Sequence, residues 1–329
     1  MPPPKSYLCY RATEPIEING RLDKSVWQVA PWTDWFVDIE GDLRPLPRLA
    51  TRARLLWDDD YLYIGAEMEE PHVWGTLTEH DSVIFQDNDF EIFLDPDGDN
   101  HSYFEIEINA LNTVWDLRLV KPYRDGGPAL DEWEIPGLKT AVSIDGTLND
   151  PSDKDRGWSV ELAIPWSAMA EHAGRRVPPT DGEQWRVNFS RVEWDVDIRD
   201  GGYHKIPNRP EHNWVWSPQG AIDMHRPERW GFVQFTNATP GEAMFVPDPS
   251  FEARERLMAV YHAQRAYQRQ TGSWAGDLTE IFPRPGELDS GAPTLRLTAG
   301  GWEATLPFTD AAGMVQTVRI REDSRIWVG

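Results

Sequence analysis

The chain has 329 residues, and its 55 Asp and Glu against 32 Lys and Arg give a formal net charge of −23. This excess of acidic side chains argues against a nucleic-acid or anionic-membrane partner, because few cationic groups are present to neutralise phosphates. A single cysteine, Cys9, excludes an intramolecular disulfide framework and a cysteine-based zinc site. The composition of 40% hydrophobic and 26% charged residues is that of a globular protein, with 17 Trp and 27 Pro as its unusual features.

The N-terminal sequence MPPPKSYLCY has no basic segment followed by an apolar one, so no signal peptide is visible. No apolar run reaches the ~18 residues that a membrane span needs. We therefore expect a cytoplasmic protein, or a periplasmic or secreted one if a leader has been removed. The sequence leaves the oligomeric state open.

Charge and tryptophan are distributed unevenly along the chain. From Gly241 onward, 9 Lys and Arg stand against 12 Asp and Glu, so residues 1–240 carry −20 together with 14 of the 17 Trp. The segment TNATPGEAMFVPDPS at 236–250 is rich in Pro, Gly and small polar residues, which is typical of a linker. We expect two domains, 1–240 and 241–329.

Residues 1–240 contain short runs rich in β-branched and aromatic residues, bounded by turn clusters such as DPDGDN. Strands are predicted at 52–56, 62–67, 90–94, 103–109, 113–120, 158–164, 185–192 and 231–235. Only short helices are expected, near 24–29 and 166–172. Many short strands separated by turns favour a mainly β fold, a β-sandwich or jelly roll.

Residues 241–329 predict a small α+β domain with one helix on an antiparallel sheet. Asp248 can cap the helix with Pro249 at its first position, and Gly272 supplies a C-terminal stop. Strands are predicted at 294–298, 302–306, 315–320 and 325–328. The stretch 259–281 weakly resembles the helix-to-loop segment of type IV pilin-like domains, and a structural or assembly role is therefore one alternative function.

The most informative stretch is the acidic hairpin FQDNDFEIFLDPDGDNHSYFEIEINALNTVWDL at 85–117. Period-two alternation sends its apolar residues to the core and its polar residues to the other face of the sheet. The polar set is Asp87, Asp89, Glu91, Glu105, Glu107 and Asn109. Like charges opposite one another are destabilising, so solvent, a cation, a ligand or an arginine such as Arg191 or Arg118 should compensate them. Two interpretations remain open, a solvated acidic face and the floor of a binding site.

Nearby segments carry groups that sugars commonly use, because aromatic rings stack on pyranose faces and carboxylates or amides bind hydroxyls. Others stand on irregular backbone, where binding residues concentrate. The candidate ligand-binding residues are Asp89, Glu91, Glu107, Asn109, Trp74, Trp115, Tyr123, Arg124, Arg191, Trp214, Trp216 and His225. No HExxH, Walker, GxSxG or GxGxxG motif is present.

The turn of the hairpin carries three aspartates at alternate positions, Asp95, Asp97 and Asp99. Carboxylate oxygens are the hard ligands that Ca²⁺ prefers. A solvated turn and a calcium-bound turn are both compatible with this pattern, which makes Ca²⁺ the one candidate cofactor.

The order of these elements resembles the family 9 carbohydrate-binding modules over residues 7–236. The matching pieces are IEINGRLDKSVWQVAPW (16–32), ARLLWDDDYLYIGAEMEEP (53–71), DNDFEIFLDPDG (87–98), YFEIEINALNTVWD (103–116), GWSVELAIPW (157–166), WRVNFSRVE (185–193) and MHRPERWGFVQF (224–235). This resemblance implies a distorted jelly-roll sandwich, often with structural calcium. It also implies sugar binding, typically at glycan chain ends, and frequent attachment to glycan-degrading enzymes.

In that family two tryptophans sandwich the sugar, helped by an acidic residue and an arginine on the sheet face. The first tryptophan falls at Phe85 and the second at Met224 in this chain. The acidic residue matches Glu91, whereas the arginine falls near Glu107. The resemblance therefore adds Phe85 to the candidate ligand-binding residues and implies a rebuilt pocket or a different ligand.

The favoured hypothesis is a non-catalytic carbohydrate-binding protein acting in carbohydrate catabolism. The alternative is a glycoside hydrolase in which Glu91 and Glu107 form the carboxylate pair that hydrolysis requires. Alternating carboxylates on a sheet explain the same pattern without catalysis, which places this alternative second.

Overall fold

The computed structural model describes residues 2–282 and 291–329, and their contacts define two compact units. Unit 1 comprises Met1–Asp97, Ser102–Val120 and Gly127–Phe245. Unit 2 comprises Gly98–His101, Lys121–Gly126 and Val246–Gly329. Two short loops from the first part of the chain therefore belong to unit 2.

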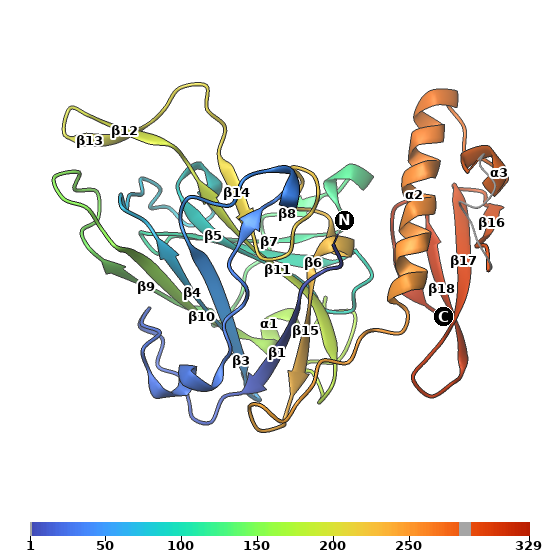
Figure 1. Cartoon of the computed structure of the whole chain (residues 1–329), viewed down its shortest axis with the longest axis horizontal. Coiled ribbons are helices and arrows are strands. Elements are labelled where there is room, and N and C mark those ends of the chain that lie inside the picture. Colours follow the sequence, from blue (N-terminus) through green and yellow to red (C-terminus); the bar gives the residue numbers. More distant parts are fainter. Residues whose placement is uncertain (1, 283–290) are drawn as a thin grey trace. The chain divides into compact units, whose positions relative to one another are not determined.

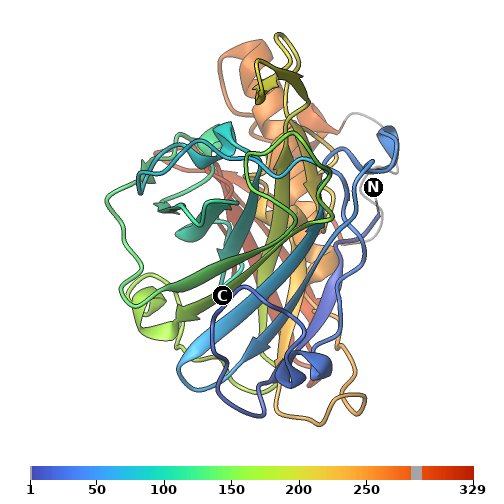
Figure 2. The ribbon, with the colours of Figure 1, turned by 90° about the vertical axis from the view of Figure 1, so that its left-hand side faces the viewer.

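Unit 1 is built around one curled β-sheet (Figures 1 and 2). Its strands are β1 (Ser6–Arg11), β2 (Val37–Asp38), β3 (Thr51–Trp57), β4 (Tyr61–Glu69), β5 (Asp89–Asp95), β6 (Tyr103–Asn109), β7 (Val114–Leu119), β8 (Ala129–Leu130), β9 (Lys139–Asp145), β10 (Gly157–Pro165), β11 (Gln184–Glu193), β14 (His212–Val215) and β15 (Gly231–Thr236). They follow the order β8-β7-β6-β5-β11-β15-β1-β3-β4-β10-β9, with β14 beside β11 and β2 beside β14. Strand β1 pairs in parallel with β15 and β3, and the other neighbours are antiparallel.

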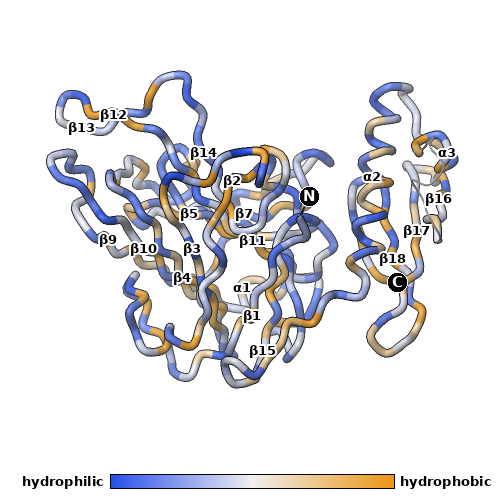
Figure 3. Tube along the Cα trace, viewed as in Figure 1, coloured by the Kyte–Doolittle hydropathy of each residue, from blue (hydrophilic) through white to orange (hydrophobic). Residues whose placement is uncertain are grey.

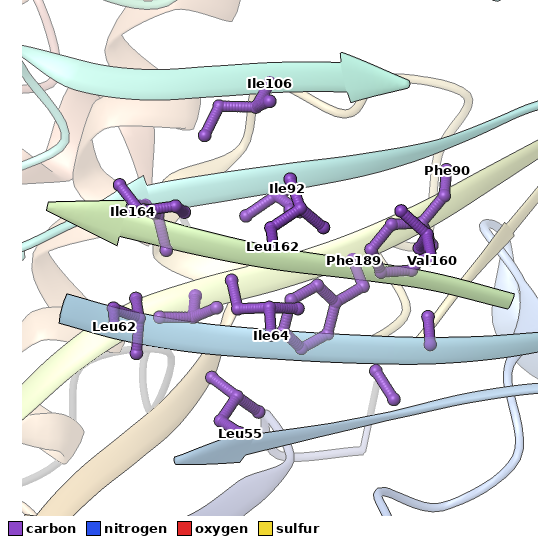
Figure 4. Close-up of a cluster of buried hydrophobic side chains, with 14 of the residues drawn as sticks. Leu55, Leu62, Ile64, Phe90, Ile92, Ile106, Val160, Leu162, Ile164 and Phe189 are labelled. Atoms are coloured by element: carbon purple, nitrogen blue, oxygen red, sulfur yellow. The ribbon is translucent and has the colours of Figure 1, made fainter. Parts of the chain in front are cut away.

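The curl brings the β6-β5-β11 part of the sheet over the β3-β4-β10 part, and the main core fills the space between them. Figure 4 shows apolar side chains from both parts pointing toward one another. The labelled residues are Leu55, Leu62, Ile64, Phe90, Ile92, Ile106, Val160, Leu162, Ile164 and Phe189. The predicted mainly β sandwich is confirmed, with strands wherever short apolar runs were bounded by turns.

Other elements of unit 1 are short. A separate hairpin, β12 (Val196–Arg199) and β13 (Gly202–Lys205), follows β11, and the short helices are η1 (Ser25–Val29), η2 (Gly41–Leu43), η3 (Ile84–Gln86), α1 (Trp166–Met169) and η5 (Pro227–Arg229). The two helices predicted from sequence correspond to η1 and α1. Across the described residues, no helix is both long enough and apolar enough to cross a membrane.

Unit 2 packs one long helix, α2 (Phe251–Thr271), on a four-stranded antiparallel sheet (Figure 1). The sheet follows the order β16 (Thr294–Leu297), β17 (Trp302–Thr309), β18 (Val315–Arg321), β19 (Ile326–Val328), and the remaining helices are α3 (Leu278–Ile281) and η4 (Tyr123–Asp125). Helix α2 carries both hydrophilic and hydrophobic residues along its length (Figure 3). Its apolar side chains, such as Leu257 and Tyr261, pack against Trp302 and Ile320 of the sheet. The predicted helix-on-sheet tail is confirmed.

The start of α2 differs from the prediction by two residues. Ser250 is the N-cap, and the Asp248 carboxylate accepts hydrogen bonds from the backbone N (2.8 Å) and Oγ (2.7 Å) of Ser250. Asp248 thus closes a turn before the helix, which is a common alternative use of a short acidic side chain. The predicted stop is confirmed, because Gly272 is the C-cap with φ +80°.

Candidate functional site

Two neighbouring strands, β5 and β6, bring a group of carboxylates onto the outer face of the curled sheet. The register places Glu91 opposite Glu107 and Asp89 opposite Asn109 across β5 and β6. Glu105 lies opposite Phe93 in the same pair, and Ser190 of β11 lies opposite Glu91. Because alternate residues share a face, these side chains gather on one side of the sheet. We call Asp89, Glu91, Glu105 and Glu107 the acidic floor.

The acidic floor is buried. Its side chains are 0%, 5%, 5% and 2% exposed in chain order, so the interpretation as a solvated acidic face does not describe the structure. Few donors reach it: the backbone N of Val192 donates to Asp89 Oδ1 (3.2 Å), and the backbone N of Phe85 donates to Glu107 Oε2 (2.9 Å). In the part of the chain that the structure describes, no Lys, Arg or His forms an ion pair with these four carboxylates.

Burial and mutual repulsion raise the pKa of every member of the floor. The pKa of Glu91 rises to about 7, chiefly through desolvation. Desolvation, followed by the charge of Glu91, raises the pKa values of Asp89, Glu105 and Glu107 well above their ordinary range. The floor therefore has a strong tendency to take up positive charge, either as protons or as a cation.

An apolar cluster covers the rest of the same face. Phe93, Tyr103, Leu117, Val215 and Trp230 belong to it, with Met224 and Ile39. The outer face of the sheet thus has an apolar half and an acidic half, and the side chains of both halves are buried.

Two partly exposed rings stand at the edge of the acidic floor. Trp115 of β7 lies opposite Glu107 in the register, and Phe85 belongs to η3. Their ring centroids are 6.4 Å apart with an angle of 29° between the planes, so the two rings are stacked. Trp115 also packs against the cluster that contains Met224. We call Phe85 and Trp115 the ring pair.

Trp194 and Lys205 complete this edge, and sequence reasoning missed both. Trp194 Nε1 donates to the Phe85 carbonyl (2.9 Å), and the Lys205 ammonium lies 3.5 Å from the centroid of the Trp194 ring. Desolvation lowers the pKa of Lys205, against the opposite pull of Asp87, Glu211 and Asp89. Trp194 ends the run WRVNFSRVEW and could have been noticed there, whereas Lys205 is brought in by the β12–β13 hairpin without a local signal.

The register corrects the expectation that Arg191 or Arg118 faces the carboxylates. Arg191 lies opposite Phe90 and Arg118 opposite Phe104, so both point to the other face of the sheet. Arg191 is fully buried there and donates to Glu70 Oε2 (2.9 Å) and Glu193 Oε2 (2.8 Å). Its charge is already neutralised within this network.

Three of the tryptophans expected around a sugar are buried. Trp214 and Trp216 are 3% and 1% exposed and belong to the main core, and Trp74 is 5% exposed. Trp214 also lies over the guanidinium of Arg191, with 5.3 Å from the ring centroid to Cζ. The structure therefore does not place these rings on the surface around the acidic floor.

The remaining candidates have separate environments. Asn109 is buried, donates to Leu77 O (2.9 Å) and accepts from two backbone N–H groups of its own turn. His225 Nδ1 is 2.9 Å from the Tyr103 hydroxyl, within the apolar half of the face. Tyr123 and Arg124 lie in Lys121–Gly126, which belongs to unit 2.

Two groups of side chains in the described residues of unit 1 have the geometry of a cation site. They are Asp89–Glu91–Glu107 and His80–Asp81–Asp116, and within each group the ligand atoms lie within 4.8 Å of one another. In the aspartate turn, Asp95 and Asp97 belong to unit 1 and Asp99 to unit 2. Carboxylate oxygens suit Ca²⁺, so the calcium interpretation of that turn stays a prediction.

A groove of about 790 Å³ elsewhere in unit 1 was not expected from the sequence. Trp32, Trp35, Arg52 and Glu67 contribute to its lining, and Trp35 is 52% exposed. The Arg52 guanidinium lies over both rings, 4.1 and 4.5 Å from their centroids, and pairs with Glu67 (2.6 Å). The signal was the run PWTDWF at 31–36, with two tryptophans on irregular backbone.

Comparison with solved structures found chains that are similar to this one. A crystal structure of a candidate carbohydrate-binding protein from Bacteroides uniformis is 18% identical, with a TM-score of 0.52 over 70% of this chain and 99% of that chain. A family 9 carbohydrate-binding module from Caldicellulosiruptor kristjanssonii, solved with cellotriose, is 16% identical with a TM-score of 0.46, over 74% of this chain and 100% of that chain. The same module with glucose gives 16% identity and a TM-score of 0.46 over 72% and 98% of the two chains. A comparison with curated proteins found no match.

The family model described as carbohydrate family 9 binding domain-like matches residues 18–231. The match covers most of unit 1 and runs from the segment before β2 to the start of β15. Since it spans well over half of the chain, this protein belongs to the carbohydrate family 9 binding domain-like family.

Proposed function

We propose that this protein is a non-catalytic carbohydrate-binding protein, and that its sugar lies against the ring pair at the edge of the acidic floor. The observation that carries the proposal is the stacked pair Phe85 and Trp115, partly exposed next to Glu107. Rings present apolar faces to pyranoses, and oxygen acceptors bind hydroxyls. Membership of the family supports this proposal. A role in polysaccharide catabolism is part of the same proposal.

The geometry of the ring pair indicates a platform rather than a clamp. A sugar held between two rings needs van der Waals contact on both sides, at about 3.5–4 Å each. The centroids of Phe85 and Trp115 are only 6.4 Å apart, so the rings contact one another instead. A pyranose would stack on their outer surface, with its hydroxyls directed toward the acceptors of the floor.

Titration calorimetry of the full chain against mono- and oligosaccharides, with and without calcium, tests this function. Trp115→Ala should weaken binding about tenfold, because a lost stacking contact of about 1.4 kcal/mol corresponds to that factor. Trp35→Ala is the matched control, since it removes a more exposed ring from the other groove. The absence of binding to any glycan of a broad array would refute the proposal.

A glycoside hydrolase remains the second candidate, favoured by one observation. Glu91 and Glu107 are directly opposite, with oxygens within 4.8 Å, and both pKa values are raised. Retaining enzymes place two carboxyl groups about 5–5.5 Å apart and keep one of them protonated. If a hydrolytic activity is detected and Glu91→Gln and Glu107→Gln leave it unchanged, this assignment fails.

A further inference from the structure

Among the residues that the structure describes, no Lys, Arg or His forms a close ion pair with the acidic floor. Asp89 and Glu91 come from β5, and Glu105 and Glu107 come from β6. The adjacent strand β11 places Ser190 opposite Glu91, and farther along the same face it places Asn188 and Arg186, which donate to the carbonyl oxygens of Ser217, Pro227 and Glu228. Arg191 and Arg118 point to the opposite face. Three further acidic residues act on the floor: the charge of Asp87 raises the pKa of Asp89, that of Glu211 raises the pKa of Glu91, and that of Asp131 raises the pKa of Glu105.

Lys205 is a cationic group whose charge acts on Asp89, but its direct contacts are with other residues. Its ammonium lies over the Trp194 ring and 3.4 Å from Gln86 Oε1. It therefore contributes long-range attraction to Asp89 without a direct contact. One distant ammonium cannot neutralise four carboxylates, because buried charges of like sign need close partners.

The second observation is a set of buried oxygens without hydrogen-bond partners. Asp89 Oδ2, Glu91 Oε2 and Glu105 Oε2 are in this state. The hydroxyl of the fully buried Ser190 lies opposite Glu91 and lowers the pKa of that carboxyl group. Buried hydroxyl and carboxyl oxygens are nearly always bonded to protein, ordered water or an ion.

The positions of the oxygens fit a single small cation. One oxygen each from Asp89, Glu91 and Glu107 lies within 4.8 Å of the other two. An ion placed among them at 2.3–2.6 Å from each is compatible with this spacing, and this is the distance range of calcium–oxygen bonds. All the donors are hard oxygens, which disfavours metals that prefer nitrogen or sulfur. Mg²⁺ usually keeps several waters and is bound through one or two carboxylates, whereas this cluster offers three.

We propose that Asp89, Glu91 and Glu107 bind one Ca²⁺ ion, with Glu105 and the Ser190 hydroxyl beside it. This site is separate from the aspartate turn and from the His80 group, and it does not depend on the carbohydrate function. The bound ion neutralises the floor next to the ring pair. A neutral, hydroxyl-rich ligand can then approach without meeting four uncompensated carboxylates.

Calcium titration of the full chain after removal of metals, followed by calorimetry and by metal analysis after dialysis, tests the proposal without any sugar. Glu107→Gln should lose one calcium per chain relative to wild type. Asp97→Asn, in the aspartate turn, is the matched control and should keep that calcium. Terbium provides a second readout: Trp115 should sensitise its emission, and Trp115→Phe should reduce the emission while the stoichiometry stays unchanged.

Thermal unfolding keeps the test valid if a variant is altered in stability. Calcium should raise the Tm of wild type but not that of Glu107→Gln. In chelator, Glu107→Gln should melt no lower than wild type, because it removes one charge from a repulsive group. Equal calcium stoichiometry in wild type and Glu107→Gln, or a wild-type Tm that calcium leaves unchanged, would overturn the proposal. Sugar binding that persists in chelator would support the carbohydrate proposal independently of calcium. Calcium binding by a chain that binds no sugar would support the calcium proposal and refute the carbohydrate proposal.

Discussion

Replacing Arg191 with Met would test how much the buried ion network on the core side of β11 contributes to the free energy of unfolding. The Arg191 guanidinium donates four hydrogen bonds, to Thr51 Oγ1, Glu69 O, Glu70 Oε2 and Glu193 Oε2, at 2.8–3.1 Å. Methionine fills similar apolar volume but removes the charge and all four donors. Two carboxylates that are 4% and 2% exposed would then lack their cation.

Removing one partner of a buried ion pair costs about 3–5 kcal/mol, because the other charge remains desolvated and unpaired. Here the loss should lie in that range, with part of it avoided where Asn88 and Arg48 still donate to the carboxylates. Arg21→Met is the control, since its pair with Asp23 leaves both side chains about two-thirds exposed. Solvent screens an exposed pair of this kind, so its loss should change the free energy of unfolding very little.

Urea unfolding followed by tryptophan fluorescence and by circular dichroism measures both changes. The pKa of Glu70 is raised to about 8, first by desolvation and next by Glu193, with Arg191 as the opposing charge. Without that charge the pKa rises further, so the Arg191→Met variant should lose less stability at pH 5 than at pH 8. A triple variant that combines Arg191→Met with Glu70→Gln and Glu193→Gln should recover most of the lost free energy of unfolding. A loss equal to that of Arg21→Met, or one independent of pH, would refute this account of the network.

Two further predictions concern the floor and a strand. Burial raises the pKa of Glu91 to about 7, so the folded protein holds a proton that the unfolded chain releases near pH 4.5. The calcium-free protein should therefore lose stability as the pH rises from about 5 to 8. In the Glu91→Gln variant, the Tm should change less over this pH range. Gly157→Ala should cost about 3 kcal/mol of unfolding free energy, because the new Cβ would lie 2.0 Å from the Met68 carbonyl oxygen at a φ of +151°. Gly182→Ala has a positive φ but open space around it, and should cost only about 1 kcal/mol; equal losses in urea titrations would contradict the steric reason.

The strands of unit 1 and the helix-on-sheet tail could be predicted because their signals are local. Alternation and turn residues specify a strand such as β5 or β6, and Gly272 specifies the end of α2. The order of the strands could not be derived from the residues alone. The parallel pairing of β1 with β15 joins Ser6 to Phe232, and a contact over so many residues leaves no periodic trace in either segment.

Alternation along β11 also predicts on which face of the sheet Arg191 lies. In WRVNFSRVE, Trp185, Val187 and Phe189 mark the core face, so the same rule places Arg191 on that face and Ser190 on the other. The burial of Trp214 and Trp216 could not be read in this way. Both rings pack against elements from distant parts of the chain, such as Tyr7 against Trp216 and Arg48 against Trp214.

The acidic hairpin shows why a polar face is not necessarily a solvated one. Alternation assigns one face of a strand pair to a core and predicts polar residues on the other, but it does not say what covers that second face. In this fold Ile39, Met224 and Trp230 pack on the apolar half, η3 contacts β6, and the acidic half is buried as well. Four carboxylates can persist there only if protons or a bound cation neutralise them. Part of the negative charge that argues against a nucleic-acid partner is therefore buried in the acidic floor, and there it requires protons or a cation.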